Sequence, residues 1–600
     1  MGLVAVPDEK GRPLLVAATI CLLLGIGFGT FTLGATEPWA EAGLAGLAGI
    51  ALVLSLLGRW RAGGLRGTDA LALVALFLAF VLLQLAPLPY PILRVVSPQS
   101  AIHWRDAGAS WGTISLTPMA TWRHLRALVI VVCVFATTMQ IAGDARLVRR
   151  LLSGILAIGV AAACVAIGER VVRYPGVPTL AGWAPIEPGN GGPFVNHSHF
   201  GQLANLAVGA GIALALLVAG RRRGEGPASV WLGGARLRPL LGIAVALGVV
   251  VLAIPLAFTI GGSLGTFGCL GVALLLFTRI DRRARGVRLS RRTRIALVAV
   301  GLVVVVGMVI GGIEHQGGIV RRLQRVEHDV RNDVGYHLLA NIARNTPRFP
   351  AFGVGLGSYG PAHEALGTGF IHPHIRHDHY ENGYAQLLFE IGIGGCLIVA
   401  AFLLVAGQKA LAATVDRDHL AARTVPGVAG GLTAVLLHTL TDFGQYLPAI
   451  ASATAVLFGV LLGWRDQSPS TRLGRWLLGG FMVCLAVAAA WATADARRDA
   501  AAETLLASAV AGELDAKEAV ASAVELRPND PDLRYEAVSL RWEALRRQSF
   551  ALAPWERFEL EPEAQAVLSE LQRVRALAPL DRRIPQAVDV VAAFVKTTRP

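Results

Sequence analysis

Charged residues are scarce in this chain of 600 residues. They make up 16% of the sequence, whereas hydrophobic residues make up 54%. Soluble globular proteins contain about 25% charged residues, so this chain lacks the polar surface of a protein that folds in water. Intrinsic disorder is excluded as well, because it requires a low hydrophobic content. The mean hydropathy of +0.55 predicts that most of the chain lies in a lipid bilayer.

Cysteine is also rare, and no two cysteines form a CxxC pair. The six residues lie inside apolar runs, at Cys21, Cys133, Cys164, Cys269, Cys396 and Cys484. Such isolated cysteines are typical of small buried side chains, so we expect neither a disulfide framework nor a cysteine–metal site. The net charge of +14 is better explained by membrane orientation than by nucleic-acid binding.

Apolar runs long enough to cross a membrane, about 20 residues each, recur along the chain. They lie near 13–34, 41–58, 69–87, 124–142, 149–168, 199–220, 239–258, 260–278, 295–313, 385–407, 427–443, 448–464 and 475–493. The first run is too long for the core of a cleavable signal peptide. We predict an all-α fold, in which residues 1–494 form a polytopic membrane helix bundle of about 12–13 spans.

Basic residues fall in alternate connections, which predicts the orientation of the bundle. Arginines mark 59–61, 144–150 and 221–223, and the connection 279–294 alone holds eight of them. Because cytoplasmic loops are enriched in Lys and Arg, the N-terminus is expected inside. The connections 88–123, 169–198 and 314–384 are then external, and an odd number of spans leaves residues 495–600 outside.

The final segment, 495–600, has the composition of a soluble domain. Two similar helix-ending turns begin at Leu526 and Leu577, 51 residues apart. They resemble the turns of tetratricopeptide repeats, although that repeat is about 34 residues long. We expect a small helical tail that binds a protein partner or packs on the external loop.

Charge is concentrated in the external loop 314–384, and the spans carry almost none. The loop contains Arg321, Arg322, Arg325, Arg331, Arg344, Arg348 and Arg376. Guanidinium groups make paired hydrogen bonds to phosphate oxygens, so the cluster predicts an anionic substrate at the outer face. The alternative is that these arginines are solvated or pair with Glu327, Asp329 and Asp333. A transporter would place charge at the membrane midplane instead.

The end of this loop carries the candidate catalytic groups. Glycine alternates with other residues over 352–357, a pattern that favours sharp turns or close backbone approach to a ligand. Five of the fourteen histidines lie between His363 and His379, yet a histidine-rich loop is more common than a metal site, and we expect no metal. Glu381, at the start of a span, or His379 can serve as a general base, since partial desolvation raises the pKa of a carboxyl group.

These residues carry a resemblance to a known family. Glu381–Asn382, then nine residues, Gly392, two residues and Gly395 resembles the signature of the O-antigen ligase and polymerase superfamily of bacterial envelope glycosyltransferases. Four further segments resemble its motifs in the same order, namely Ser115–Leu116–Thr117–Pro118 to Thr121, Phe194 to Phe200, Pro350 to Tyr359, and His438–Thr439–Leu440–Thr441–Asp442–Phe443. The resemblance covers about residues 115–465.

The chain departs from the family at two positions. Glu381 stands where the family commonly has histidine, so either Glu381 or His379 takes the role of the base. The family's Ser-Arg-Gly segment reads Ser263–Leu264–Gly265 here, so one cation for phosphate is absent from its usual place.

The resemblance implies an inverting glycosyltransferase at the periplasmic face of a bacterial cytoplasmic membrane. The donor is a glycan on a polyprenyl pyrophosphate, and the acceptor is lipid A core, another lipid-linked glycan or a protein hydroxyl. The family's chemistry requires no cofactor. The implied binding residues are Arg321, Arg322, Arg325, Arg331, Asn382, Tyr384, Asn196 and His199. A ligase is favoured over a polymerase, and a solute transporter or a non-catalytic binding protein is the alternative.

Overall fold

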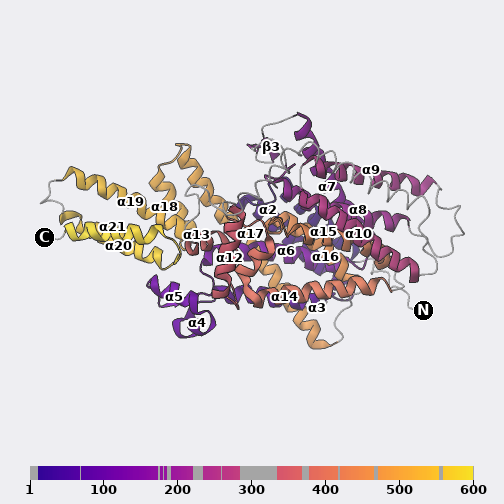
Figure 1. Cartoon of the computed structure of the whole chain (residues 1–600), viewed down its shortest axis with the longest axis horizontal. Coiled ribbons are helices and arrows are strands. Elements are labelled where there is room, and N and C mark those ends of the chain that lie inside the picture. Colours follow the sequence, from indigo (N-terminus) through magenta and orange to yellow (C-terminus); the bar gives the residue numbers. More distant parts are fainter. Residues whose placement is uncertain are drawn as a thin grey trace.

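The computed structural model describes residues 11–67, 69–172, 176–179, 182–185, 191–219, 234–257, 260–283, 334–367, 378–415, 419–464, 471–552 and 558–598. Within these ranges the regular elements are almost entirely α-helices (Figure 1). The predicted span 295–313 lies outside the described residues. The same holds for Arg321, Arg322, Arg325, Arg331 and Arg376.

Ten of the described helices are long and apolar enough to cross a membrane. They are α1 (Arg12–Thr30), α2 (Pro38–Arg61), α6 (Pro118–Ile141), α7 (Ala145–Val172), α8 (His197–Ala219), α9 (Gly234–Leu256), α10 (Ile260–Arg283), α14 (Gly383–Ala413), α15 (His419–His438) and α17 (Arg472–Val510). Two shorter apolar helices, α3 (Asp69–Leu85) and α16 (Pro448–Gly463), also lie in the described part of the bundle. The prediction of an all-α, multi-pass membrane protein is confirmed at this level.

The centre of the bundle is α8, which packs against α7, α9, α10, α15 and α16. Glycines allow its close contact with α15, since a Cβ atom on Gly209 would lie 2.5 Å from the Cα atom of Gly431. Small residues let membrane helices approach closely, which strengthens dispersion contacts where no hydrophobic effect acts between helices. The peripheral helix α14 instead exposes Leu397 and Leu404, as expected of a surface that faces lipid.

Helix α14 is sharply kinked at Gly392, whose φ of 59° and ψ of −170° are not helical. The segment 350–357 docks against this kink. Ile393 donates its backbone N–H to Pro350 O at 2.8 Å, and Gly394 donates to Ala351 O at 2.9 Å. A Cβ atom on Gly392 would lie 2.6 Å from the backbone nitrogen of Gly353. Both the positive φ and this close approach therefore require glycine.

The C-terminal tail lies at one end of the bundle, to the left in Figure 1. We call this the tail-side end. The tail contains the end of α17, then α18 (Ala516–Leu526), α19 (Pro531–Ala551), α20 (Glu561–Arg575) and α21 (Arg583–Thr598), and consecutive helices pack together. The predicted domain boundary between residues 494 and 495 falls inside α17, which is one continuous helix of 39 residues.

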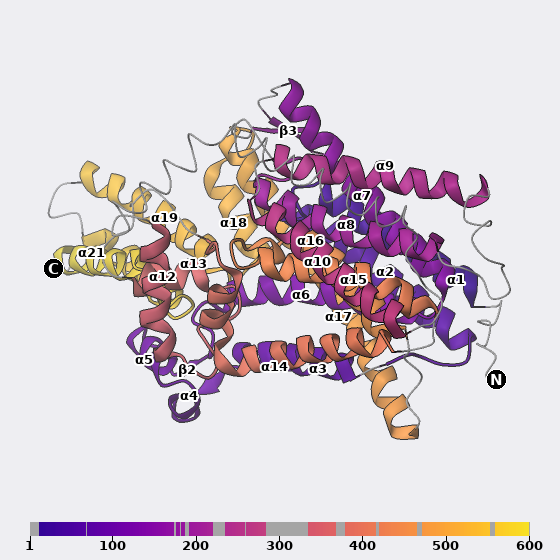
Figure 2. The ribbon, with the colours of Figure 1, turned by 45° about the vertical axis from the view of Figure 1, so that its right-hand side comes forward.

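Short elements cover the tail-side end. The pair β1 (Leu88–Pro89) and β2 (Trp111–Gly112) is antiparallel, with Leu88 opposite Gly112. It encloses α4 (Tyr90–Val96) and α5 (Pro98–Asp106), and a second antiparallel pair joins β3 (Gly176–Thr179) to β4 (Gly182–Pro185). The other short elements are α12 (Val334–Asn345), η2 (Thr346–Arg348), α13 (Tyr359–Leu366) and η3 (Gly444–Tyr446). Figure 2 shows α12 and α13 between the bundle and the tail.

Candidate functional site

The five segments singled out in the sequence meet at the tail-side end of the bundle. The 115–121 segment joins the glycine-rich segment through Leu116 N–H, which donates to Val354 O at 2.9 Å. The hydroxyl of Thr117 donates to the Ser358 hydroxyl at 2.6 Å. Val354 in turn donates its backbone N–H to Phe389 O of α14, at 3.0 Å. Residues more than 200 positions apart in sequence thus share one polar framework.

The other two segments join this framework from α8 and from the end of α15. Gly383 donates its backbone N–H to Thr439 O at 2.9 Å, which ties the start of α14 to the end of α15. His199, in the first turn of α8, lies with its Nε2 atom 3.5 Å from the Asp442 carboxylate. The described parts of all five segments therefore line one region.

Glu390 lies at the centre of this region, fully buried in α14. Its Oε1 atom accepts hydrogen bonds from Tyr359 N–H at 3.2 Å and from Gln386 Nε2 at 3.0 Å. Its Oε2 atom accepts from the Tyr446 hydroxyl at 2.9 Å. These donors come from three segments of the chain. A buried carboxyl group is tolerated because it is hydrogen-bonded, and here it holds the glycine-rich segment, α14 and η3 together.

His379 is attached to Glu390 through Gln386. The Gln386 Nε2 atom lies 3.2 Å from His379 Nδ1, and Gln386 Oε1 accepts the backbone N–H of Tyr380 at 2.9 Å. The imidazole of His379 stacks on Phe443, with the ring centres 4.5 Å apart and the planes inclined by 13°. Burial lowers the pKa of His379 to about 4, and the nearby His124 contributes to this shift. His379 is therefore neutral near pH 7.

Phe443 also contacts a second pair of polar residues, His199 and Asp442. His199 makes an edge-on contact with Phe443 at 4.9 Å. Asp442 accepts a hydrogen bond from Gln202 Nε2 at 2.8 Å. Burial raises the pKa of Asp442 to about 6, although backbone hydrogen bonds and Gln202 oppose the shift, and the charge of Glu381 contributes to it.

Three predicted site residues, Glu381, Asn382 and Tyr384, lie at the start of α14. Glu381 is exposed and close enough to influence Asp442. Asn382 caps α14, because its Oδ1 atom accepts the backbone N–H groups of Tyr384 and Ala385 at 3.1 and 3.0 Å. The Tyr384 hydroxyl donates to Leu436 O at 2.8 Å. Asn382 and Tyr384 thus hold the helix in place, and Glu381 faces solvent.

Of the remaining predicted site residues, Asn196 and His199 are described by the structure and the four arginines are not. Asn196 accepts the backbone N–H of Ser198 at 2.8 Å, so its side-chain oxygen helps to begin α8. His199 belongs to the site, as described above. The four arginines predicted to bind substrate, Arg321, Arg322, Arg325 and Arg331, lie outside the described residues. Among the described residues, no group of three or more His, Cys, Asp or Glu is placed to hold a metal ion.

Sequence reasoning missed Glu390, Gln386, Tyr446 and His124. His124 lies on α6 with its ring 5.8 Å from Tyr446 and 6.5 Å from His379. Glu390 carried a usable signal, because an acidic residue inside an apolar span is costly and therefore a candidate functional group. The others carried none, because their importance depends on contacts with distant segments.

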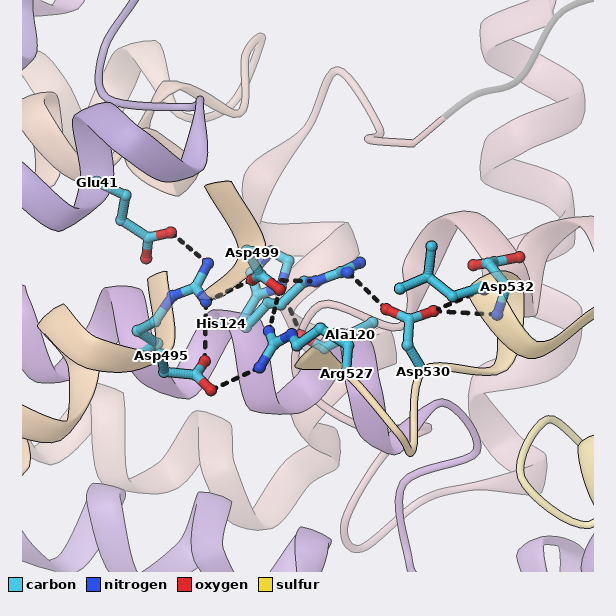
Figure 3. Close-up of polar contacts among 11 residues, drawn as sticks. Glu41, Ala120, His124, Asp495, Asp499, Arg527, Asp530 and Asp532 are labelled. Atoms are coloured by element: carbon cyan, nitrogen blue, oxygen red, sulfur yellow. Dashed lines mark hydrogen bonds and ion pairs between the residues drawn. The ribbon is translucent and has the colours of Figure 1, made fainter. Parts of the chain in front are cut away.

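A buried cluster of charges lies beside the site and joins the tail to the bundle. Figure 3 shows Glu41 of α2, Asp495 and Asp499 of α17, and Arg527 together. Arg126 of α6 lies between them, at 2.5 Å from Glu41 and Asp499 and 2.8 Å from Asp495. Arg527 contacts Asp495 at 2.6 Å and also pairs with Asp499. We call these five residues the ionic cluster.

The ionic cluster extends to the turn before α19. Arg123 of α6 lies 2.9 Å from Asp530 and 3.7 Å from Asp499. His124 is the next residue along α6, so the same helical turn holds one residue of the site and the arginines that bind the tail. The tail is thereby docked against the start of α6.

Chemically, the region combines one exposed carboxylate, the neutral imidazole of His379, the buried acidic side chains of Glu390 and Asp442, and several hydroxyl groups. Such a set can remove a proton from a hydroxyl and hold an anionic oxygen by hydrogen bonds. No protein-family model matches this chain, and no curated protein matches it significantly.

Proposed function

We propose that this protein is an inverting glycosyltransferase of the O-antigen ligase and polymerase type. It transfers a glycan from polyprenyl pyrophosphate to an acceptor hydroxyl at the periplasmic face of a bacterial cytoplasmic membrane. In this orientation the tail-side end faces the periplasm. The arginine-rich connections 59–61 and 144–150 face the cytoplasm, in keeping with the enrichment of basic residues on that side.

The observation that supports the proposal best is the meeting of the five segments at one end of the bundle. Each was identified by its resemblance to a family motif, and together they extend from residue 115 to residue 443. Motifs that serve unrelated structural purposes have no reason to meet. Motifs that build one active site must meet, because catalysis requires its groups within hydrogen-bond reach of one substrate.

The proposed reaction balances without a cofactor. The acceptor oxygen forms a bond to the anomeric carbon on the face opposite the phosphate. The bond from that carbon to the phosphate oxygen breaks, and its electron pair leaves with polyprenyl pyrophosphate. The proton of the acceptor hydroxyl passes to a base, for which Glu381 and His379 are the candidates. Arginines of the external loop, Arg321, Arg322, Arg325 and Arg331, bind the pyrophosphate.

The position of the site agrees with a lipid-linked donor. The exposed leucines of α14 face lipid, and Asn382 caps the start of the same helix in the site. A polyprenyl chain can therefore remain in the bilayer while its pyrophosphate reaches the helix start. The site lies beside the docked tail, and a glycan or protein acceptor approaches from that side.

The test uses purified protein in liposomes that contain a polyprenyl-pyrophosphate-linked glycan and a lipid A core acceptor. The wild type should form an attached product, visible as a shift on a gel. A lengthened lipid-linked glycan would indicate a polymerase. The variant Glu381→Gln should lose about 10²–10⁴-fold in rate if Glu381 is the base. The matched control is Glu364→Gln on α13, an exposed glutamate of the same region.

Two results would count against the proposal. Absence of transfer and of lengthening with all lipid-linked donors would remove the glycosyltransferase assignment. Saturable uptake of a solute by the same liposomes would favour the transporter alternative.

A further inference from the structure

We infer that His379 is fixed as the neutral tautomer that carries its proton on Nε2, and that it donates a hydrogen bond to the leaving phosphate. The base is then Glu381. The tautomer is derived from geometry alone, whereas its role in the reaction rests on the proposed function.

The first step is the orientation of the Gln386 amide. Its oxygen and nitrogen are distinguished by their neighbours, because a backbone N–H can only donate. The N–H of Tyr380 points at one end of the amide from 2.9 Å. That end must be the oxygen, and the nitrogen Nε2 must face the other way.

The contact with Glu390, at the other end of the Gln386 amide, requires the same orientation. Gln386 Nε2 lies 3.0 Å from Glu390 Oε1. That oxygen already accepts the backbone N–H of Tyr359, so it acts as an acceptor. Turning the Gln386 amide over would place two donors together at Tyr380 and two acceptors together at Glu390. Two backbone N–H groups therefore fix the direction of every hydrogen bond between them.

The third step concerns the imidazole itself. The two hydrogens of Gln386 Nε2 are directed at Glu390 Oε1 and at His379 Nδ1, which lies 3.2 Å away. Nδ1 must accept, so it carries no proton. A neutral imidazole has one protonated nitrogen, which is then Nε2. Within the part of the chain that the structure describes, no hydrogen bond engages Nε2.

In this tautomer His379 can donate a hydrogen bond but cannot act as the base. A base needs a free lone pair, and the lone pair of His379 at Nδ1 is used by Gln386, whereas Nε2 has a proton. The ring can donate but is not available to accept the acceptor's proton. Its plane is fixed by stacking on Phe443, so the N–H direction is fixed too. A negatively charged phosphate oxygen is the best partner for such a donor.

Glu390, Gln386 and Phe443 are positioning residues in this arrangement. Glu390 orients Gln386, Gln386 sets the tautomer, and Phe443 sets the plane of the ring. Glu381 lies two residues from His379, is exposed and precedes the cap of α14. It is placed to meet an acceptor hydroxyl that arrives from solvent.

The tautomer is tested directly by nitrogen-15 NMR of histidine-labelled protein in lipid nanodiscs at pH 7. Subtracting the spectrum of His379→Gln isolates the His379 signals. We expect one unprotonated nitrogen, assigned to Nδ1 by its coupling pattern, and one protonated nitrogen, Nε2. A protonated Nδ1, alone or together with Nε2, would overturn the inference. This measurement does not depend on any enzymatic activity.

A second variant tests the origin of the tautomer. In Gln386→Leu the donor to Nδ1 is lost, so the two neutral tautomers should exchange and their nitrogen signals should average. Unchanged His379 signals in this variant would show that Gln386 does not set the tautomer. Should the variant fail to fold, the wild-type spectrum still decides the main point.

The role in the reaction is tested by comparing two substitutions of the same side chain. Glutamine keeps an N–H donor but has no basic nitrogen, whereas alanine has neither. If His379 donates to the leaving phosphate, His379→Ala should lose about 10²–10³-fold in kcat and His379→Gln should keep at least ten times more activity than His379→Ala. Equal loss in both variants would overturn the donor role. Failure of the proposed function would appear differently, as absence of transfer by the wild type.

Discussion

Two clusters of polar residues meet at the start of α6, one through Arg126 and the other through His124, and they are held together by different interactions. The ionic cluster contains Arg126, Arg527 and three carboxylates, all buried and mutually paired. The site that includes His379 and Gln386 is instead held together by directed hydrogen bonds. The ionic cluster holds the tail against the bundle, and the site leaves an N–H and a carboxylate for a substrate.

The difference shows how the chain separates attachment from chemistry. Paired charges resist opening, since a charge left alone in a buried region is heavily penalised. Hydrogen bonds between neutral groups are weaker, but they fix which atom donates and which accepts. A joint between two parts of a protein needs the first property, whereas a catalytic group needs the second.

The largest expected effect on stability is at the ionic cluster, which attaches the tail to the bundle. Replacing Arg126 by Met removes the cation shared by Glu41, Asp495 and Asp499. Asp495 and Asp499 keep their pairing with Arg527, whereas the buried Glu41 loses the ion pair that the described structure gives it. We expect a loss of about 3–5 kcal/mol of stability, measured by thermal unfolding of the purified protein in detergent. An unfolding temperature equal to the wild type would contradict the view that this cluster attaches the tail.

The next largest effect is expected at Gly392, where the site is held together by close backbone packing and not by ion pairs. Gly392→Ala places a Cβ atom 2.6 Å from Gly353 N at a positive φ of 59°. We expect a cost of about 1–3 kcal/mol in the same unfolding assay. Gly407→Ala is the matched control in the same helix, because a Cβ atom there meets nothing within 4 Å. It should leave stability unchanged or raise it slightly. Equal effects at the two positions would remove the strain argument.

The pH dependence of stability separates the two titrating groups of the site. The pKa of His379 is lowered to about 4 from its ordinary 6.5, so the unfolded chain binds this proton first. Stability should therefore fall as pH drops from about 6.5 to 4, and His379→Gln should reduce that fall. The check is the unfolding temperature between pH 4 and 8.

Asp442 should act in the opposite direction. Its pKa is raised to about 6 from 3.8, so the folded protein binds this proton first, and stability should fall as pH rises from about 3.8 to 6. Asp442→Asn should remove that contribution. If both variants shift the pH profile in the same direction, one of the two assignments is wrong.

The smallest effect is expected for an exposed pair in the tail. Arg541 and Glu563 lie 2.7 Å apart with about half of each side chain exposed. Arg541→Met should cost at most about 1 kcal/mol, because solvent and salt screen such a pair. The comparison with Arg126→Met keeps the chemical change the same, whereas burial and the number of paired carboxylates differ. A similar loss of stability in both would show that burial does not set the strength of the ionic cluster.

The spans could be predicted from sequence because hydropathy is a local property. Each predicted run that lies in the described residues contains the core of a helix, as in α14 and α17. The predicted boundary at residue 494 lies inside α17, because the alanine-rich segment through Asp495 and Asp499 is helical on both sides of the change in composition. The sequence marks a change in composition there, but the backbone continues without interruption.

The site was partly predictable for a related reason. Gly392, His379 and Asp442 lie in recognisable patterns. Gln386 and Tyr446 become important only through Glu390, and no local pattern reports a hydrogen bond between residues that are 56 positions apart. Likewise the capping role of Asn382 depends on the backbone geometry of the first turn of α14.

The continuity of α17 has a mechanical consequence. Its 39 residues make a rod about 58 Å long at 1.5 Å per residue, which passes from the bundle into the tail without a hinge. Asp495 and Asp499 are four residues apart and therefore project from one face of this rod, where both pair with Arg126 of α6. Arg126 lies two residues after His124 on α6, so these ion pairs connect the continuous helix of the tail directly to the turn of α6 that carries His124.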